Sequence, residues 1–315
     1  MPAGKERTAE VVDYAILHGD DETCKIFNIN RATLDRYKRI YKEHFGESAD
    51  LLMKLKKQYT MDELKMLAEG IRPKVSKNIV YDFSGDIFTA LVLTDTHWGS
   101  NYSDENRVYA AFEEGEKQKA DCLFHIGDVT EGMSGRPNSV LEMNAIGYKK
   151  QRDESIRIMS KWSRPAYYIA GNHDDFLNTK MGAGVSIVED ICKEIPQAVY
   201  VGQDSGTVEI KGVKIGLFHG NDSASSYALS YRLQRHINGM APQGKPQIYF
   251  TGHDHKAFYM FYRNVHALAC GCIQDQTPWM AGKGIPSMPG FYIVKMCLGG
   301  GEVKWFEPRF YPFYK

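Results

Sequence analysis

The sequence predicts an α/β protein in which a sheet layered with helices follows a small all-α unit. Up to about residue 75 the patterns are helical, and from Ile79 onward short β-branched and aromatic runs alternate with longer amphipathic stretches. The tail from Val265 is mostly strand. Such alternation is typical of sheets covered by helices. We therefore expect two domains, residues 1–75 and residues 76–315.

The N-terminal domain is predicted to consist of short helices. They are expected over residues 9–18, 21–27, 31–44 and 51–58, with a further helix that begins at Thr60. This last start has the form of a capping box, because Glu63 follows Thr60 by three residues. Gly70 and Pro73 then supply a stop signal.

In the second domain, five predicted strands are followed directly by oxygen or imidazole ligands. The strands are expected over residues 88–94, 122–126, 166–170, 213–218 and 247–251. The motifs that follow them are, in chain order, Asp95-Thr-His97, Gly127-Asp128, Gly171-Asn-His-Asp174, His219 and Gly252-His-Asp-His255. Because layered sheets place their sites at the carboxyl ends of strands, we expect these side chains to converge.

The residue types in these motifs suit a pair of metal ions. Two carboxylates, one amide and four histidines are more than one divalent ion needs. Two ions ~3.5–4 Å apart that share a carboxylate form a geometry used to hydrolyse phosphate esters. Imidazole and carboxylate together select Mn, Fe or Zn over Ca or Mg. We expect manganese first, with iron or zinc as alternatives.

The ordered motifs resemble those of the calcineurin-like metallophosphoesterases, namely Asp-x-His, Gly-Asp, Gly-Asn-His-Asp/Glu, a lone His and Gly-His-x-His. The resemblance covers residues from about 79 to 310 and implies two packed β-sheets flanked by helices. It makes Asp128 the bridging ligand of the two metals. The ligands that it assigns to the first metal are Asp95, His97 and His255. Those that it assigns to the second metal are Asn172, His219 and His253.

The same resemblance leaves His173 free to act on the substrate, where a positioned histidine can give the leaving alkoxide a proton. Asp174 is expected to orient the His173 ring, as carboxylates orient imidazoles elsewhere. His125 lies inside a predicted strand and is expected in the core or behind the ligands. Arg136, in the loop after the bridging aspartate, is expected to contact either a phosphate or solvent.

Two features indicate a nucleic-acid substrate. Asp95-Thr-His-Trp-Gly-Ser100 and Gly127-Asp-Val-Thr-Glu-Gly132 look like the motifs of the nuclease branch, including Mre11-type enzymes and the exonuclease subunit of archaeal polymerase D. Residues 21–27 and 31–44 also have the lengths of a helix-turn-helix, with Asn30 able to cap the second helix. This segment is similar to resolvase-like helix-turn-helix domains of phage and mobile-element proteins.

The predicted helix-turn-helix is locally basic, although the whole chain has 39 basic and 39 acidic residues. Between Lys25 and Lys42 there are six basic residues and one acid, Asp35. The residues expected to contact DNA are Arg31, Arg36, Lys38 and Arg39. Those expected to pack inward are Leu34, Tyr37 and Ile40. A basic connector is expected over residues 47–77. The alternative is a solvated basic face on a bundle used for dimerisation or docking.

Composition restricts the class of protein. A chain of 315 residues with 43% hydrophobic and 25% charged residues is typical of globular proteins, and no run approaches the ~18 apolar residues of a membrane helix. The polar N-terminus lacks the pattern of a secretory signal. The six scattered cysteines are expected to be free thiols. We expect a cytoplasmic protein without a membrane partner.

These observations predict a two-metal phosphoester hydrolase with an appended helix-turn-helix, a DNA-directed phosphodiesterase or nuclease. The alternative is a phosphomonoesterase acting on nucleotides or phosphoproteins, with the helical domain used for assembly, for example into a homodimer. A third hypothesis is a DNA-binding regulator with an inactive phosphoesterase domain. It is disfavoured because an inactive site need not keep seven ligands.

Overall fold

The computed structural model describes residues 5–45, 76–134, 136, 138–177, 186–220 and 228–313. The chain divides into two compact units, Met1–Ile71 and Arg72–Lys315, and each is described by itself. The helices predicted over residues 51–58 and from Thr60 lie outside the described ranges, as does nearly all of the predicted connector. In the part of the chain that is described, no helix is long and apolar enough to cross a bilayer.

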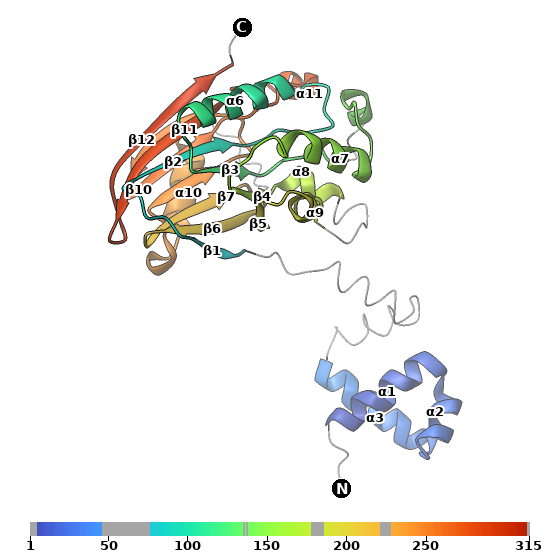
Figure 1. Ribbon diagram of the computed structural model, residues 1–315. Helices are drawn as coiled ribbons and strands as arrows, with labels where there is room; N and C mark the ends of the chain where they lie inside the picture. The colour runs from blue at the N-terminus through green and yellow to red at the C-terminus, as the bar shows by residue number, and fades with distance from the viewer. Residues whose placement is uncertain are drawn as a thin grey trace. The chain divides into compact units, whose positions relative to one another are not determined.

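The described part of the first unit consists of three helices, α1 (Lys5–His18), α2 (Asp20–Ile26) and α3 (Arg31–Phe45) (Figure 1). The helices enclose a small apolar cluster that includes Val11, Ala15 and Leu34. Helix α3 begins with the predicted cap, because the Asn30 side chain accepts a hydrogen bond of 2.8 Å from the Thr33 backbone N–H. The cap satisfies a donor that the helix itself leaves without a partner.

The inward face of α3 differs from the prediction at one position. Leu34 is fully buried and Tyr37 is partly buried, but Ile40 is 36% exposed. The next residue, Tyr41, is only 4% exposed. Positions 34, 37 and 41 follow the i, i+3, i+7 spacing of one helix face. The prediction for Ile40 is therefore wrong, and Tyr41 takes its place.

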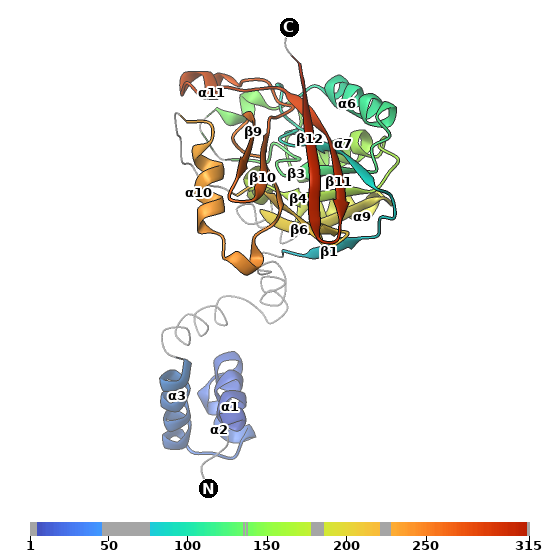
Figure 2. The same ribbon diagram turned by 90° about the vertical axis from the view of Figure 1, so that its left-hand side faces the viewer.

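The second unit contains two six-stranded sheets packed face to face (Figures 1 and 2). The first sheet consists, in spatial order, of β12 (Glu302–Pro312), β11 (Gly290–Gly299), β2 (Ile87–Leu93), β3 (Cys122–Ile126), β4 (Ala166–Ala170) and β5 (Ala198–Gln203). The second consists of β1 (Asn78–Tyr81), β6 (Ser205–Ile210), β7 (Val213–Phe218), β8 (Ile248–Thr251), β10 (Val265–Cys270) and β9 (Ala257–Tyr262). The two-sheet architecture that the resemblance implied is thus confirmed.

Helices cover the outer faces of both sheets. Those that pack against the first sheet or its helical layer are α6 (Glu105–Lys117), α7 (Tyr148–Met159) and α9 (Ile187–Glu194). Helix α10 (Tyr231–Gly239) packs against the second sheet. The shorter elements are η1 (Ser139–Glu142), α8 (Asn172–Asp175), η3 (Pro242–Gly244) and α11 (Pro278–Gly282). The order of layers is therefore helix, sheet, sheet, helix.

Strand β2 illustrates how these layers are encoded. Its Phe88, Ala90 and Val92 side chains belong to the core between the two sheets, whereas Leu91 and Leu93 belong to the core under the helices. Successive side chains of a strand point to opposite faces, so a strand covered on both sides is apolar at nearly every position. The continuous apolar run in the sequence is the result.

Strand direction brings the ligand motifs to one edge. Strands β2, β3 and β4 run parallel to one another in the first sheet, and β7 and β8 run parallel in the second. Parallel neighbours end at the same edge of a sheet, and the turns that follow them therefore lie side by side. All five predicted motifs occupy such turns.

Candidate metal centre

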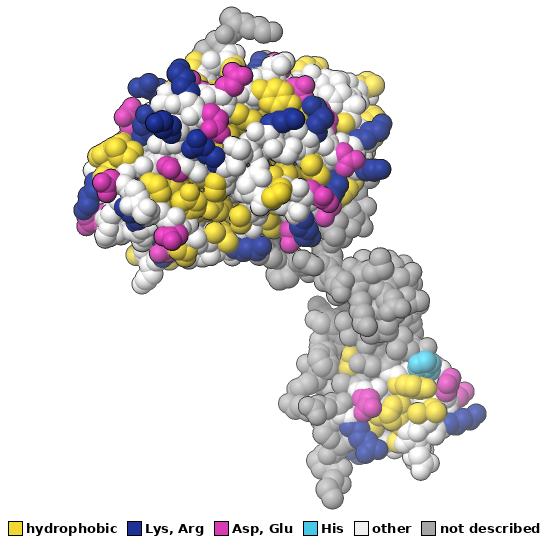
Figure 3. All heavy atoms as spheres, in the orientation of Figure 1, with side chains coloured by type: hydrophobic (Ala, Val, Ile, Leu, Met, Phe, Trp, Pro, Cys, Tyr) yellow, Lys and Arg dark blue, Asp and Glu magenta, His cyan; other side chains and the backbone are white. Residues whose placement is uncertain are grey.

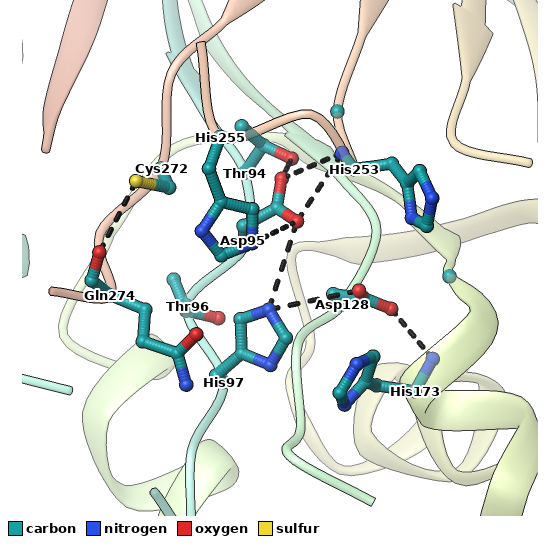
Figure 4. Close-up of polar contacts among 12 residues, drawn as sticks. Thr94, Asp95, Thr96, His97, Asp128, His173, His253, His255, Cys272 and Gln274 are labelled. Atoms are coloured by element: carbon teal, nitrogen blue, oxygen red, sulfur yellow. Dashed lines mark hydrogen bonds and ion pairs between the residues drawn. The ribbon is translucent and has the colours of Figure 1, made fainter. Parts of the chain in front are cut away.

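The structure brings the seven predicted ligands together at the strand ends. Figure 4 shows Asp95, His97, Asp128, His253 and His255 directed toward one another. Among the predicted ligands, two groups of side chains could each hold a metal ion, with the ligand atoms of each group within 4.8 Å of one another. The first group is Asp95, His97 and His255. The second is Asp128, His219 and His253. Asn172 adjoins the second group, because its Oδ1 lies 2.7 Å from Nδ1 of His253.

The Asp128 carboxylate lies between these two groups. Its Oδ2 is 3.0 Å from Nε2 of His219 in the second group and 3.7 Å from Nε2 of His97 in the first. Its other oxygen accepts a hydrogen bond of 2.8 Å from the backbone N–H of His173. One oxygen that faces histidines of both groups occupies the place of a bridging ligand.

Two of the ligand histidines, His219 and His97, have Nδ1 engaged and Nε2 directed to the centre. Nδ1 of His219 lies 2.6 Å from the carbonyl oxygen of Ile126, which can only accept, so Nδ1 carries the proton. Nδ1 of His97 likewise lies 3.0 Å from Oε2 of Glu131. Each ring then presents the lone pair of Nε2 to the centre. Both Nε2 atoms are buried and face Oδ2 of Asp128, at 3.0 Å for His219 and 3.7 Å for His97, without the geometry of a hydrogen bond. A metal ion held between these atoms would explain the arrangement.

The charges at the centre favour cations. Burial by itself would raise the pKa of Asp95, but His255 and His219 outweigh it and hold that pKa well below its usual range. Burial lowers the pKa of His97, yet the neighbouring carboxylates of Asp95 and Glu131 raise it to about 10. The negative field that attracts protons to these rings also attracts divalent ions, whose binding displaces protons.

Five of the predicted ligands have left-handed backbone, an unusual conformation for residues other than glycine. They are Asp95 (φ 53°), His97 (φ 47°), Asp128 (φ 48°), His253 (φ 78°) and His255 (φ 52°). Each such residue costs ~1–3 kcal/mol and persists only where the surroundings impose it, most often at functional sites. Backbone hydrogen bonds impose it here, such as that of 3.0 Å from the His97 N–H to the Asp128 carbonyl.

A glycine next to the bridge makes the close approach of two turns possible. A Cβ atom on Gly171 would overlap Oδ1 of Asp128 and lie 2.5 Å from its backbone nitrogen. We expect Gly171→Ala to displace Asp128 and to weaken metal binding by ~10- to 100-fold, as loss of a supporting contact does. Titration with Mn²⁺ measures the change. Backbone strain does not contribute, because the φ of Gly171 is −113°.

Gly239 provides the matched control for this substitution. It lies in α10, and a Cβ atom there would meet nothing within 4 Å. Gly239→Ala is expected to leave metal binding unchanged, because the added methyl group has open space at the end of α10. Equal Mn²⁺ affinities for both variants would contradict the steric argument.

The predicted role of Asp174 is wrong. Its carboxylate accepts hydrogen bonds from three backbone N–H groups, those of Gly171, Val129 and Thr130, at 2.8–3.2 Å, and it does not orient the His173 ring. Asp174 instead ties the turn after β3 to the turn after β4. The carbonyl oxygen of Glu131 orients the His173 ring, because it accepts a hydrogen bond of 2.7 Å from Nδ1.

Sequence reasoning did not identify Glu131 and Gln274 as parts of the site. The Glu131 carboxylate binds Nδ1 of His97, and Nε2 of Gln274 donates to the same Glu131 oxygen at 3.0 Å. Gln274 lies shortly after the end of β10. A polar residue after a strand end, the pattern that identified the metal ligands, could therefore have identified it. His97, Glu131 and His173 also form a third group that could hold a metal ion, an arrangement that competes with the predicted ligand sets.

Two further predicted residues have defined surroundings. His125 is fully buried behind the ligands, with Nε2 3.0 Å from the Thr96 hydroxyl, and burial lowers its pKa to about 3. The Arg136 guanidinium lies over the Trp279 ring, 4.4 Å from its centroid, and 3.9 Å from Oε1 of Glu131. Arg136 is thus held beside the centre, and its side chain is not a solvated loop arginine.

The four predicted DNA contacts fall into two pairs. Arg31 lies 2.7 Å and Lys38 2.6 Å from the Asp20 carboxylate. Arg36 and Arg39 are exposed, and neither pairs with an acid whose side chain is described. Figure 3 shows Lys and Arg side chains of this unit lying beside Asp and Glu on the face drawn. The positive surface is therefore smaller than the count of basic residues indicated.

Two packed sheets with a candidate two-metal centre at their strand ends define a class of α/β metallohydrolase. Comparison with protein families identifies the family within that class. The model of the calcineurin-like phosphoesterase superfamily domain matches residues 89–282, which is more than half of the chain. The chain belongs to this superfamily, and the predicted family membership is confirmed.

Individual relatives are distant. A UDP-2,3-diacylglucosamine hydrolase of Vibrio vulnificus is 21% identical over 135 residues, which are 42% of this chain and 47% of the relative. The enzyme of that name from Vibrio parahaemolyticus is 23% identical over 137 residues, which are 42% of this chain and 48% of the relative. The chain thus spans about half the length of the curated relatives it matches.

Solved structures give similarly distant matches. A novel archaeal phosphodiesterase is 14% identical with a TM-score of 0.42, and the match covers 71% of this chain and 100% of that chain. Vps29 from Entamoeba histolytica in complex with zinc is 15% identical with a TM-score of 0.38, over 71% of this chain and 99% of that chain.

Proposed function

We propose that this protein is a two-metal phosphodiesterase that cleaves DNA. The observation that carries the phosphoesterase part is the convergence of side chains from four strand ends into two groups, with Asp128 between them and Asn172 from a fifth strand end beside the second group. Mixed imidazole and carboxylate ligands favour Mn, Fe or Zn. Two such ions, when held by these residues, would supply Lewis acidity and an activated water for hydrolysis of a phosphoester.

The protein's own residues supply orientation and proton transfer. The ligand rings would hold the ions through Nε2 of His97 and His219, because Nδ1 of each ring is engaged by Glu131 or Ile126. The His173 ring donates from Nδ1 to a carbonyl, which leaves Nε2 to exchange a proton with the leaving oxygen. Burial lowers the pKa of His173, so a proton that the ring takes up is readily passed on.

The DNA-directed part of the proposal is supported by helix α3. The helix begins at a capped turn, as the second helix of a helix-turn-helix does, and exposes Arg36 and Arg39. Asp20 and Asp21, the first two residues of α2, neutralise part of the basic segment. Two arginines are consistent with modest, salt-sensitive affinity for the phosphate backbone.

The salt dependence of DNA binding tests this role. Replacement of both Arg36 and Arg39 by alanine is expected to flatten the plot of log K against log salt by about 1.8, since each phosphate contact contributes ~0.9. Fluorescence anisotropy with duplex DNA at several salt concentrations gives the slope. Hydrolysis of bis-p-nitrophenyl phosphate is expected to stay at the wild-type rate, because the candidate metal centre is in the other unit.

Asp20→Asn is the complementary variant, because it releases Arg31 and Lys38 from their shared carboxylate. It is expected to steepen the slope if these cations then reach phosphates. An unchanged slope in the double arginine variant, together with an altered sedimentation coefficient, would contradict DNA binding and favour the assembly hypothesis.

The relatives suggest a second candidate, a hydrolase of a UDP-linked sugar. The supporting observation is the match of 135 residues to proteins named UDP-2,3-diacylglucosamine hydrolase. Parallel assays of single- and double-stranded DNA, bis-p-nitrophenyl phosphate, p-nitrophenyl phosphate and a UDP-linked sugar with Mn²⁺ separate the candidates. Cleavage of the UDP-linked sugar without cleavage of DNA would overturn the nuclease proposal and leave the metal centre intact.

A further inference from the structure

Arg232 is a buried arginine close to the candidate metal centre. It is 3% exposed and lies on α10, whose Leu233 and Ile237 pack into the core beside the second sheet. A fully charged side chain is rarely buried unless its donors are satisfied. The buried guanidinium of Arg232 therefore requires hydrogen-bond partners inside the protein.

The guanidinium of Arg232 joins two ligand-bearing turns. Nη1 donates a hydrogen bond of 2.6 Å to the carbonyl oxygen of Gly252, and Nη2 donates to the carbonyl oxygen of His219. Nη1 also lies 3.1 Å from Oδ2 of Asp254. His219 follows β7, and Gly252 follows β8 and immediately precedes His253. One side chain thus holds the backbone at or beside two ligands of the second group.

The shape of the guanidinium suits this arrangement. Its five N–H donors lie in one plane and point in fixed directions, so two carbonyls that bind it are held at a set separation. An ammonium group carries the same charge but presents a single flexible nitrogen. Helix α10 anchors the stem of Arg232 through the apolar contacts of its neighbours, so the fork itself has a defined position.

We propose that Arg232 is a positioning residue that sets the separation of His219 and His253 and thereby the affinity of the second metal ion. The inference rests on the proposed two-metal function. Arg232 acts through the backbone of the turns and supplies no ligand atom. Its removal is therefore expected to leave the first group, Asp95, His97 and His255, able to bind one ion.

The test combines Mn²⁺ titration with electron paramagnetic resonance. Arg232→Ala is expected to bind the first ion with wild-type affinity. It is expected to bind the second ion ~10- to 100-fold more weakly, which is the usual loss when a residue that orients metal ligands is removed. The spectrum at two equivalents of Mn²⁺ is expected to change from that of a coupled pair to that of an isolated ion. Added guanidinium chloride, at concentrations too low to unfold the protein, is expected to restore part of the coupled signal.

Arg235→Ala is the matched control, because Arg235 lies on the same helix and is exposed. It is expected to keep wild-type affinity for both ions. Arg232→Lys keeps the positive charge beside Asp254. If the alanine variant does not fold, the same Mn²⁺ titration of the lysine variant tests the inference. The lysine variant is also expected to bind the second ion weakly, since one ammonium cannot reproduce the fork.

Failure of the positioning role and failure of the proposed two-metal function give different results in these titrations. Wild-type affinity for the second ion in either folded Arg232 variant overturns the positioning role. Fewer than two Mn²⁺ ions bound by the wild-type chain overturns the proposed two-metal function instead. Thermal unfolding of each variant in the absence of metal identifies any loss of affinity that arises from unfolding.

Discussion

Asp128→Asn is expected to abolish metal binding at the candidate two-metal centre and, with it, the proposed phosphoester hydrolysis. The Asp128 carboxylate faces Nε2 of both His219 and His97, and a neutral amide cannot balance the charge of two cations at that position. We expect the turnover of bis-p-nitrophenyl phosphate to fall by more than ~10- to 100-fold, the loss typical when a residue that only supports a metal ligand is replaced. Metal analysis should find fewer than two ions per chain.

Asp153→Asn is a suitable control for this substitution. Asp153 lies on α7, is half exposed and pairs with Arg152 on the surface. Exposed ion pairs contribute little, so both metal content and turnover should stay at wild-type values. Two ions per chain with retained turnover in the Asp128 variant would show that another residue bridges the metals. Addition of EDTA to the wild type should reproduce the loss.

His173→Ala is expected to separate metal binding from catalysis. The variant should keep both ions, because neither predicted ligand set contains His173, and should slow hydrolysis by ~10²- to 10⁴-fold, the range for a positioned proton donor. The loss should be larger for a substrate with a poor leaving group, such as an alkyl diester, than for a nitrophenyl ester. Steady-state rates for both substrates and metal analysis measure these effects.

Loss of a metal ion from the His173 variant would have a specific structural meaning. His97, Glu131 and His173 form a third group with ligand atoms close enough to share an ion. Metal loss would show that this group is occupied, and His173 would then be a ligand. Equal slowing of both substrates, with metals retained, would show that His173 positions the phosphate and does not protonate the leaving oxygen.

The sequence by itself predicted the five strands that carry the ligand motifs, but not β1, β5, β6 or β9. Strands buried on both faces appear as continuous apolar runs, as β2 shows, and the residue after such a run must lie at the sheet edge. The positions of Asp95, Asp128 and His219 in the candidate metal centre follow from this local rule. The Asn30 cap was likewise predictable, because a cap acts on the N–H three residues later.

Only the tertiary structure decided which groups support the ligands. Asp174 is next to His173 in the sequence but binds the backbone of the turn that follows β3. Asp20 lies outside the basic run of α3 and yet pairs with Arg31. Such contacts join residues that are distant along the chain, or turn a side chain away from its sequence neighbour. No local pattern encodes them, because their geometry is set by the packing of strands and helices against one another.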